Sequence, residues 1–242
     1  MTRPLPFCLA LLGLLPCVAL SQARPDLPRT EALVLDGTNE FRRGERLVKV
    51  ERNARLEAAA KAFAAHMAAS GELSHEADGS TPSKRARGHG YDFCLVSENI
   101  AHLYTSKGYE TADLAKRLVE GWKKSPGHRK NMAEPDVVDS GVAVAQTAKQ
   151  GVQHYYAVQM FGRPKAASVE FDISNPTAEP VSYRVGERLF FLAPRTSRTH
   201  TECTAQELVV DLPDARDSKF TTRKGDKFVV AREKEQLSVR RQ

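Results

Sequence analysis

The hydrophobic period of the chain changes twice, and these changes limit the folds that it can adopt. Asn53–Ser70 is rich in Ala and Leu, with apolar side chains at steps of three and four, which predicts a helix. Glu110–Lys124 predicts another helix, and an earlier one is expected to start at Thr30. Gly141–Gln146 and Val152–Phe161 then predict a β-hairpin. Helices followed by paired strands indicate an α+β domain.

The chain after Pro164 has a different pattern, with no helical stretch and with short apolar segments between turn residues. The predicted strands are Ser168–Ile173, Val181–Val185, Leu189–Leu192, Glu207–Leu212, Lys227–Ala231 and Leu237–Arg240. This spacing predicts a small all-β domain, either a sandwich or a barrel. We therefore expect one domain over residues 30–163 and a C-terminal β domain over residues 165–242.

The first residues have the pattern of a signal peptide. Leu5–Leu20 is an almost unbroken apolar run, and Ser21–Ala23 supplies the small residues that signal peptidase requires. We expect residues 1–23 to be removed and the protein to be secreted or periplasmic. A retained membrane anchor and a lipid anchor at Cys17 are the alternatives. No later segment is apolar enough to predict a transmembrane span.

The cysteines and the charge agree with export. Cys94 and Cys203 remain after cleavage, and an even pair in an oxidising compartment predicts a disulfide, with two free thiols as the alternative. The formal net charge of +6 is spread along the chain. Because no basic stripe carries interleaved aromatic residues, we expect no nucleic-acid partner.

Three polar residues at predicted element boundaries are candidates for chemistry, namely His75, Glu98 and His128. Two imidazoles and a carboxylate can hold a divalent metal ion with a position left open, or can act in acid–base catalysis. These residues are far apart in the sequence, so their spacing defines no metal motif, and purely structural roles are the alternative. Ser125 is close to His128 and could be a nucleophile, but we interpret it as the N-cap of a short helix.

A series of short motifs stands in a fixed order over nearly all of residues 30–163. They are Asn39-Glu40-Phe41-Arg42, Leu73-Ser74-His75, Arg85 with Gly90-Tyr91, Ser97-Glu98-Asn99-Ile100-Ala101, Trp122 with Ser125-Pro126-Gly127-His128-Arg129-Lys130-Asn131-Met132, Gly141-Val142-Ala143-Val144, and Tyr155-Tyr156-Ala157-Val158-Gln159-Met160-Phe161-Gly162. This order resembles the CAP superfamily of cysteine-rich secretory, antigen 5 and pathogenesis-related 1 proteins. The pattern is most similar to the bacterial SCP-like extracellular branch.

The resemblance implies an α-β-α sandwich with a central cleft. In eukaryotic members two His and two Glu line that cleft and can hold a divalent cation such as zinc. His75 and Glu98 match one His and one Glu of this set, and Ser125 stands where the second Glu is expected. His128 is the candidate to replace the second His, so the set is incomplete.

We therefore predict an extracytoplasmic module that binds a small ligand, a lipid, an envelope polymer or a peptide. His75, Glu98 and His128 are expected to converge on one pocket and are the candidate metal ligands. The further predicted binding residues are Asn99, Ser125 and Gln159. A metal-assisted, peptidase-like hydrolase using the same cleft is one alternative. A scaffold whose β domain makes the functional contact is another.

Overall fold

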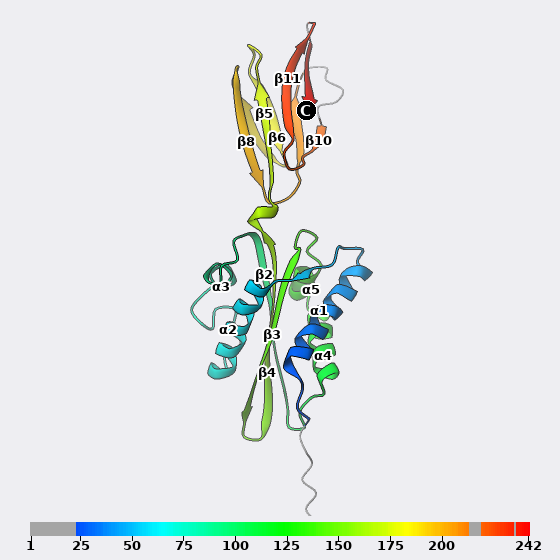
Figure 1. Cartoon of the computed structure of the whole chain (residues 1–242), viewed down its shortest axis with the longest axis vertical. Coiled ribbons are helices and arrows are strands. Elements are labelled where there is room, and N and C mark those ends of the chain that lie inside the picture. Colours follow the sequence, from blue (N-terminus) through cyan, green and yellow to red (C-terminus); the bar gives the residue numbers. More distant parts are fainter. Residues whose placement is uncertain (1–22, 213–218, 235) are drawn as a thin grey trace, which may run out of the picture.

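The structure of the chain is a computed structural model that describes residues 23–212, 219–234 and 236–242. The predicted signal peptide, residues 1–23, lies outside these residues apart from Ala23. Within the described ranges, no helix is both long and apolar enough to cross a membrane. The elements form two parts, which lie end to end along the long axis of the molecule (Figure 1).

The first part is built around a four-stranded sheet in the order β1-β3-β4-β2. Its strands are β1 (Glu51–Arg52), β2 (Phe93–Thr105), β3 (Asp139–Lys149) and β4 (Val152–Pro164). β3 and β4 form the predicted hairpin, with Ala143 opposite Val158. β2 pairs with β4 alone, in antiparallel register, and is therefore an edge strand.

Helices cover both faces of this sheet, as the α-β-α sandwich requires (Figure 1). α2 (Ala54–Ser70) and α3 (Pro82–Gly88) lie on one face, where Ile100 and Met160 belong to the core. α1 (Leu27–Gly44), α4 (Thr111–Lys124) and α5 (Pro126–Met132) lie on the other, where Trp122 and Phe161 belong to a second core.

Helix α2 has the boundaries that its sequence predicts. The Asn53 side chain accepts hydrogen bonds from the backbone N–H groups of Arg55 and Leu56, and Gly71 ends the helix with a φ of 78°. The helix packs closely on β3, because a Cβ atom added at Gly141 would lie 2.3 Å from the backbone of Leu56. Only glycine permits this approach of helix to strand.

In the first part, α1 and the strands β1 and β2 differ from the sequence prediction. α1 begins at Leu27 rather than at Thr30, because the Asp26 side chain caps it by accepting a hydrogen bond from the Arg29 N–H group. The 13-residue strand β2 was not predicted. Its centre carries Glu98 and Asn99, which are polar yet buried, and they interrupt the apolar alternation that marks a strand.

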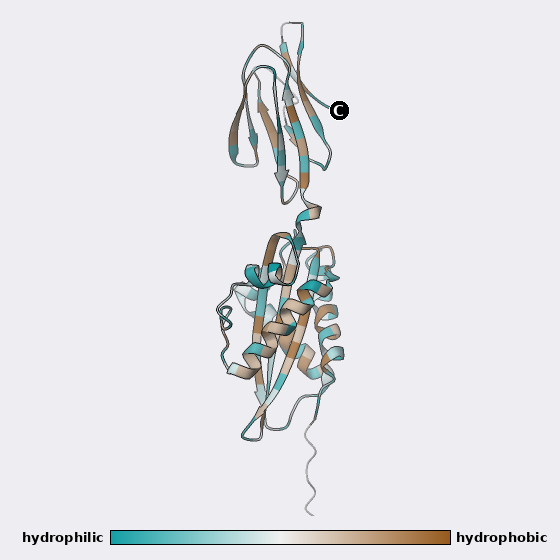
Figure 2. Ribbon diagram, turned by 60° about the vertical axis from the view of Figure 1, so that its left-hand side comes forward, coloured by the Kyte–Doolittle hydropathy of each residue, from teal (hydrophilic) through white to brown (hydrophobic). Residues whose placement is uncertain are grey.

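The second part consists of two four-stranded sheets, in the orders β10-β9-β6-β7 and β12-β11-β5-β8. The strands are β5 (Val169–Asn175), β6 (Val181–Val185), β7 (Arg188–Leu192), β8 (Thr196–Glu202), β9 (Glu207–Asp211), β10 (Lys219–Thr221), β11 (Lys227–Glu233) and β12 (Gln236–Arg241). Apolar residues of both sheets form one core, so this part is a sandwich rather than a barrel. Hydrophobic and hydrophilic residues alternate along its strands (Figure 2). β8 and β10 were not predicted, because His200 is the only buried residue of β8 and β10 has only three residues.

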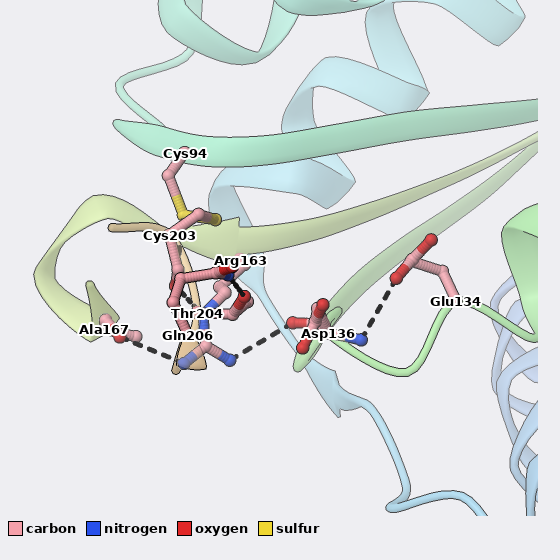
Figure 3. The surroundings of a disulfide bond; sticks show 8 residues. All are labelled: Cys94, Glu134, Asp136, Arg163, Ala167, Cys203, Thr204 and Gln206. Atoms are coloured by element: carbon pink, nitrogen blue, oxygen red, sulfur yellow. Dashed lines mark hydrogen bonds between the residues drawn. A yellow bond between two sulfur atoms is a disulfide. The ribbon is translucent and has the colours of Figure 1, made fainter. Parts of the chain in front are cut away.

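Covalent and hydrogen bonds join the two parts around the short helix η1 (Lys165–Ala167). Cys94 and Cys203 form the predicted disulfide, with their Cα atoms 5.4 Å apart (Figure 3). Arg163 donates hydrogen bonds to the carbonyl oxygens of Cys203, Asp136 and Ala167, at 2.7, 3.2 and 3.0 Å. One end of β2 is thus fixed to the loop that follows β8.

Candidate functional site

Glu98 is the centre of a buried polar cluster on the α2–α3 face of the sheet. Its side chain has no solvent exposure, and β2 places it between two donors. The Nη2 atom of Arg85 donates to both carboxylate oxygens, at 2.8 and 2.9 Å. The Nδ1 atom of His75 lies 2.8 Å from Oε1 of the same carboxylate. The structure therefore brings two of the predicted site residues together.

Arg85, to which its sequence motif gives no role, is held through both of its terminal nitrogens, although its buried Nε atom has no hydrogen-bond partner among the described residues. Its guanidinium carbon lies 3.5 Å above the centre of the Phe63 ring, and its Nη1 atom donates to Asp78 at 2.9 Å. Burial raises the pKa of Asp78, but hydrogen bonds from Ser80 and Arg85 and the charge of Arg85 outweigh this effect and lower it. Arg85 thus compensates two carboxylates and holds Glu98 in one position.

His75 lies at the boundary between this cluster and solvent. It follows α2, and 47% of its side chain is exposed. Because Nδ1 faces Glu98, the carboxylate favours the tautomer with a proton on Nδ1, and this leaves the Nε2 lone pair for another molecule. A buried carboxylate that orients a half-exposed imidazole is suited to binding a polar group or to acting as a base.

His128 approaches the same place from α5, on the opposite side of the edge strand. Burial lowers the pKa of His128, and the neighbouring His75 lowers it further. The effect of His75 on the pKa of His128 indicates that the two side chains lie in the same region of the molecule. Near neutral pH, His128 is in its neutral form, which can both donate and accept a hydrogen bond.

Asn99 faces the other side of the sheet and holds α5 in place. Its Nδ2 atom donates to the carbonyl oxygen of His128 at 3.1 Å, and its Oδ1 atom accepts from Asn131 at 2.9 Å. Asn131 also donates to the backbone carbonyl of Glu98 at 3.1 Å. These bonds connect β2 to the helix that carries His128. Asn131 belongs to a motif seen in the sequence, but the motif alone gave it no role.

The other two predicted binding residues have no side-chain hydrogen bond to His75, Glu98 or His128 among the described residues, although Gln159 lies directly opposite Asn99 in the β2–β4 register. Gln159 is fully buried and bonds to Thr38 at 3.1 Å and Ser140 at 3.2 Å, in the core beneath α1. Ser125 occupies the N-cap position of α5, but its side chain makes no capping hydrogen bond. Their roles in ligand binding remain predictions.

The geometry gives little support to Glu98 as a metal ligand. Among the residues that the structure describes, no three His, Cys, Asp or Glu side chains are grouped closely enough to hold a metal ion. Both oxygens of Glu98 already accept hydrogen bonds, and a cation beside the Arg85 guanidinium would be repelled. The set of His75, Glu98 and His128 thus does not fit a three-ligand centre.

A separate pocket of about 1380 Å³ opens on the far face of the first part, between α1 and α4. Its lining includes Gly37, Phe41, Val119 and Lys123. None of the predicted site residues lines it. This pocket is therefore a separate feature from the His75 cluster.

Comparisons with known proteins agree with the motif series. The sequence profile of the CAP family, described as the cysteine-rich secretory protein family, matches residues 35–161, slightly more than half of the chain. A search of curated proteins finds no match.

Several solved structures are similar to slightly more than half of the chain. One is an outer surface protein of Borrelia burgdorferi, with 24% identity, a TM-score of 0.47, and 56% of this chain and 93% of that chain covered. Another is an extracellular protein of Bacillus anthracis that contains an SCP domain, with 22% identity, a TM-score of 0.46, and 57% and 41% covered. A cysteine-rich secretory protein of Staphylococcus aureus has 16% identity, a TM-score of 0.43, and 57% and 39% covered. The chain thus spans less than half the length of the latter two proteins.

Proposed function

This chain belongs to the cysteine-rich secretory protein (CAP) family, and we propose that it is an exported binding module whose ligand contacts His75 and His128. The observation that supports this proposal most strongly is the fixed chain of contacts from Arg85 through Glu98 to His75. A site that holds one imidazole in a single tautomer, half-exposed beside a second imidazole, is pre-organised for a polar group of a ligand. We expect that group to come from a small molecule, a lipid headgroup, an envelope polymer or a peptide.

Export is part of the same proposal. The N-terminal apolar run supports it, and so does the Cys94–Cys203 disulfide, because disulfides form and persist in oxidising compartments. The protein would then act outside the cytoplasm, as a secreted or periplasmic protein. The β-sandwich would supply attachment or a second binding surface.

A hydrolase using the same residues has less support. In the described part of the chain, no Ser, Thr or Cys side chain is hydrogen bonded to the His75 or His128 imidazole, as an activated nucleophile would be. Metal-assisted chemistry would need ligands other than Glu98, whose oxygens Arg85 and His75 already engage. Binding without turnover therefore fits the geometry better.

The proposal is tested with the purified full chain and a panel of peptidoglycan fragments, anionic lipid vesicles and mixed peptides. We expect one class to bind, with the affinity lowered by about tenfold or more in His75→Ala and His128→Ala, as for loss of a hydrogen bond to a desolvated group. His89→Ala, an exposed residue near α3, is the matched control. Unchanged affinity in both variants, or cleavage of the bound molecule, would overturn the binding-module proposal.

A further inference from the structure

A second pair of imidazoles lies farther along the same face of the first sheet. His102 on β2 is opposite Tyr156 on β4, and Tyr104 is opposite His154, so all four side chains share the α2 face. The Nε2 atom of His102 lies 3.0 Å from the Nδ1 atom of His154. His102 is four residues beyond Glu98, about 13 Å along the strand. The two imidazole pairs are therefore separate sites.

Helix α2 does not cover this second pair. The helix ends at Ser70, and a Cβ atom added at Gly71 would lie 3.9 Å from the hydroxyl of Tyr156. The β3–β4 hairpin extends past this end of α2 (Figure 1). Tyr104 is 65% exposed, and His102 and His154 are half-buried. Solvent and ions can thus reach the two imidazoles.

Neighbouring rings restrict the orientation of both imidazoles. His102 stacks on the buried ring of Tyr156, with ring centres 4.3 Å apart and planes 12° apart. His154 packs beside Tyr104, with ring centres 5.9 Å apart. Burial lowers the pKa of His102, and His154 lowers it further, so the uncharged form of His102 is favoured at neutral pH. Uncharged imidazole is the form that binds metal ions.

We propose that His102 and His154 together bind one divalent transition-metal ion, with water completing its coordination. Metal–nitrogen bonds of about 2.0–2.1 Å at an angle of about 90–110° place two nitrogens about 2.9–3.4 Å apart. The observed separation of 3.0 Å lies within this range. To direct both lone pairs at one ion, the imidazoles must turn from their hydrogen-bonded orientation. His154 has more freedom to do so, because its contact with Tyr104 is looser than the stacking of His102 on Tyr156. Imidazole ligands suit Cu²⁺, Ni²⁺ and Zn²⁺ rather than Mg²⁺ or Ca²⁺.

Proton balance is simple at this site. Each uncharged imidazole carries one proton, and the hydrogen bond between the rings places one of these protons between them. When the ion enters, that proton moves to the other ring nitrogen, so each ring keeps one proton and none is released at neutral pH. Protonation of both rings at acidic pH removes the lone pairs and releases the ion.

The test uses the untagged full chain with its disulfide intact, titrated with Cu²⁺ alone and then with Zn²⁺ alone at pH 7.5. Cu²⁺ is the more sensitive probe, because it has the highest affinity in the divalent series. Calorimetry gives the stoichiometry and affinity, and electron paramagnetic resonance of the Cu²⁺ complex reports the number of nitrogen ligands. His102→Gln and His154→Gln are made singly, and circular dichroism checks their fold. His66→Gln is the matched control, since His66 is exposed on α2.

We expect one Cu²⁺ per chain with two nitrogen ligands. Each single variant should weaken binding by at least about tenfold. A loss of this size is typical even when the replaced residue only hydrogen bonds to a metal ligand. His66→Gln, His75→Gln and His128→Gln should bind as the unaltered chain does. Binding that survives both single variants, or that is lost in His75→Gln or His128→Gln, would overturn the assignment. An unaltered chain that binds neither ion at pH 7.5 would overturn it as well.

Discussion

Arg85 lies between two carboxylates and an aromatic ring, and its side chain is only 4% exposed. Water cannot readily replace Arg85 as the hydrogen-bond donor to these carboxylates, because Glu98 is fully buried and Asp78 is mostly buried. At this scale, one cation determines the position of the carboxylate that orients His75. Removing the Arg85 guanidinium leaves the negative charge of buried Glu98 without a compensating positive charge.

We predict that Arg85→Met destabilises the protein by about 3–5 kcal/mol, the usual cost of removing one partner of a buried ion pair. Arg85→Lys should fall between Arg85→Met and the unaltered chain, because it keeps the charge but not the two-oxygen contact. Denaturant unfolding measures both. Arg87→Met, which removes an exposed arginine stacked on Phe93, is the control. A loss below about 1 kcal/mol would contradict the role given to Arg85.

At the scale of elements, the contact of α2 with β3 is so close that Gly141 admits no side chain. We predict that Gly141→Ala costs about 1–3 kcal/mol, because the added methyl group must push the helix away from the strand. Gly121→Ala on α4 is the control, since nothing lies within 4 Å of a Cβ atom there. The free energy of unfolding is measured for both variants. Equal values for Gly141→Ala and Gly121→Ala would contradict the packing argument.

His200 gives strand β8 its one buried contact with the sandwich core. Its Nε2 atom lies 2.9 Å from the Tyr183 hydroxyl. Burial lowers the pKa of His200; Glu202 opposes this shift, whereas Arg188 and Arg198 add to it. The unfolded chain therefore takes up this proton at a higher pH than the folded protein does.

The resulting stabilisation is present above the unfolded pKa of about 6.5 and is lost as the pH falls below it. We predict that the free energy of unfolding decreases between pH 7.5 and 5.5, and that His200→Gln decreases less over this range. Gln keeps a hydrogen bond to Tyr183 but does not titrate. Unfolding curves at the two pH values test this, with His66→Gln as the exposed control. The same decrease in His200→Gln and the unaltered chain would show that His200 is not responsible.

At the scale of the whole molecule, two parts with separate cores depend on one junction. The Cys94–Cys203 disulfide spans 109 residues, and Arg163 adds three hydrogen bonds to carbonyl oxygens beside it (Figure 3). A crosslink over so long a loop mainly restricts the unfolded chain. The junction therefore stabilises the molecule beyond what the two cores provide.

We predict that the double variant Cys94→Ala, Cys203→Ala loses about 4–5 kcal/mol on chain-entropy grounds. The double replacement leaves no free thiol that could pair wrongly. Thermal unfolding should show a lower midpoint, and limited proteolysis should cut first near Lys165–Ala167. Cleavage that starts elsewhere, with an unchanged midpoint, would mean that the two cores need no crosslink.

The sequence predicted those features of the fold that depend on residues close together in the chain. Asn53 and Gly71 set the limits of α2, the spacing of apolar residues in 110–124 marked α4, and alternation marked most strands of the sandwich. The motif order also indicated the CAP family, and the even pair of cysteines indicated the disulfide. Each of these signals depends on near neighbours or on composition, so it is present before the chain folds.

Only the tertiary structure decided the partners of buried polar groups. β2 was not predicted because Glu98 and Asn99 are satisfied by Arg85, His75 and Asn131, which come from other elements. The same holds for the pairing of His102 with His154, which depends on the register of β2 against β4. A buried polar side chain is stable only with a partner, and a partner distant in the sequence leaves no periodic signal.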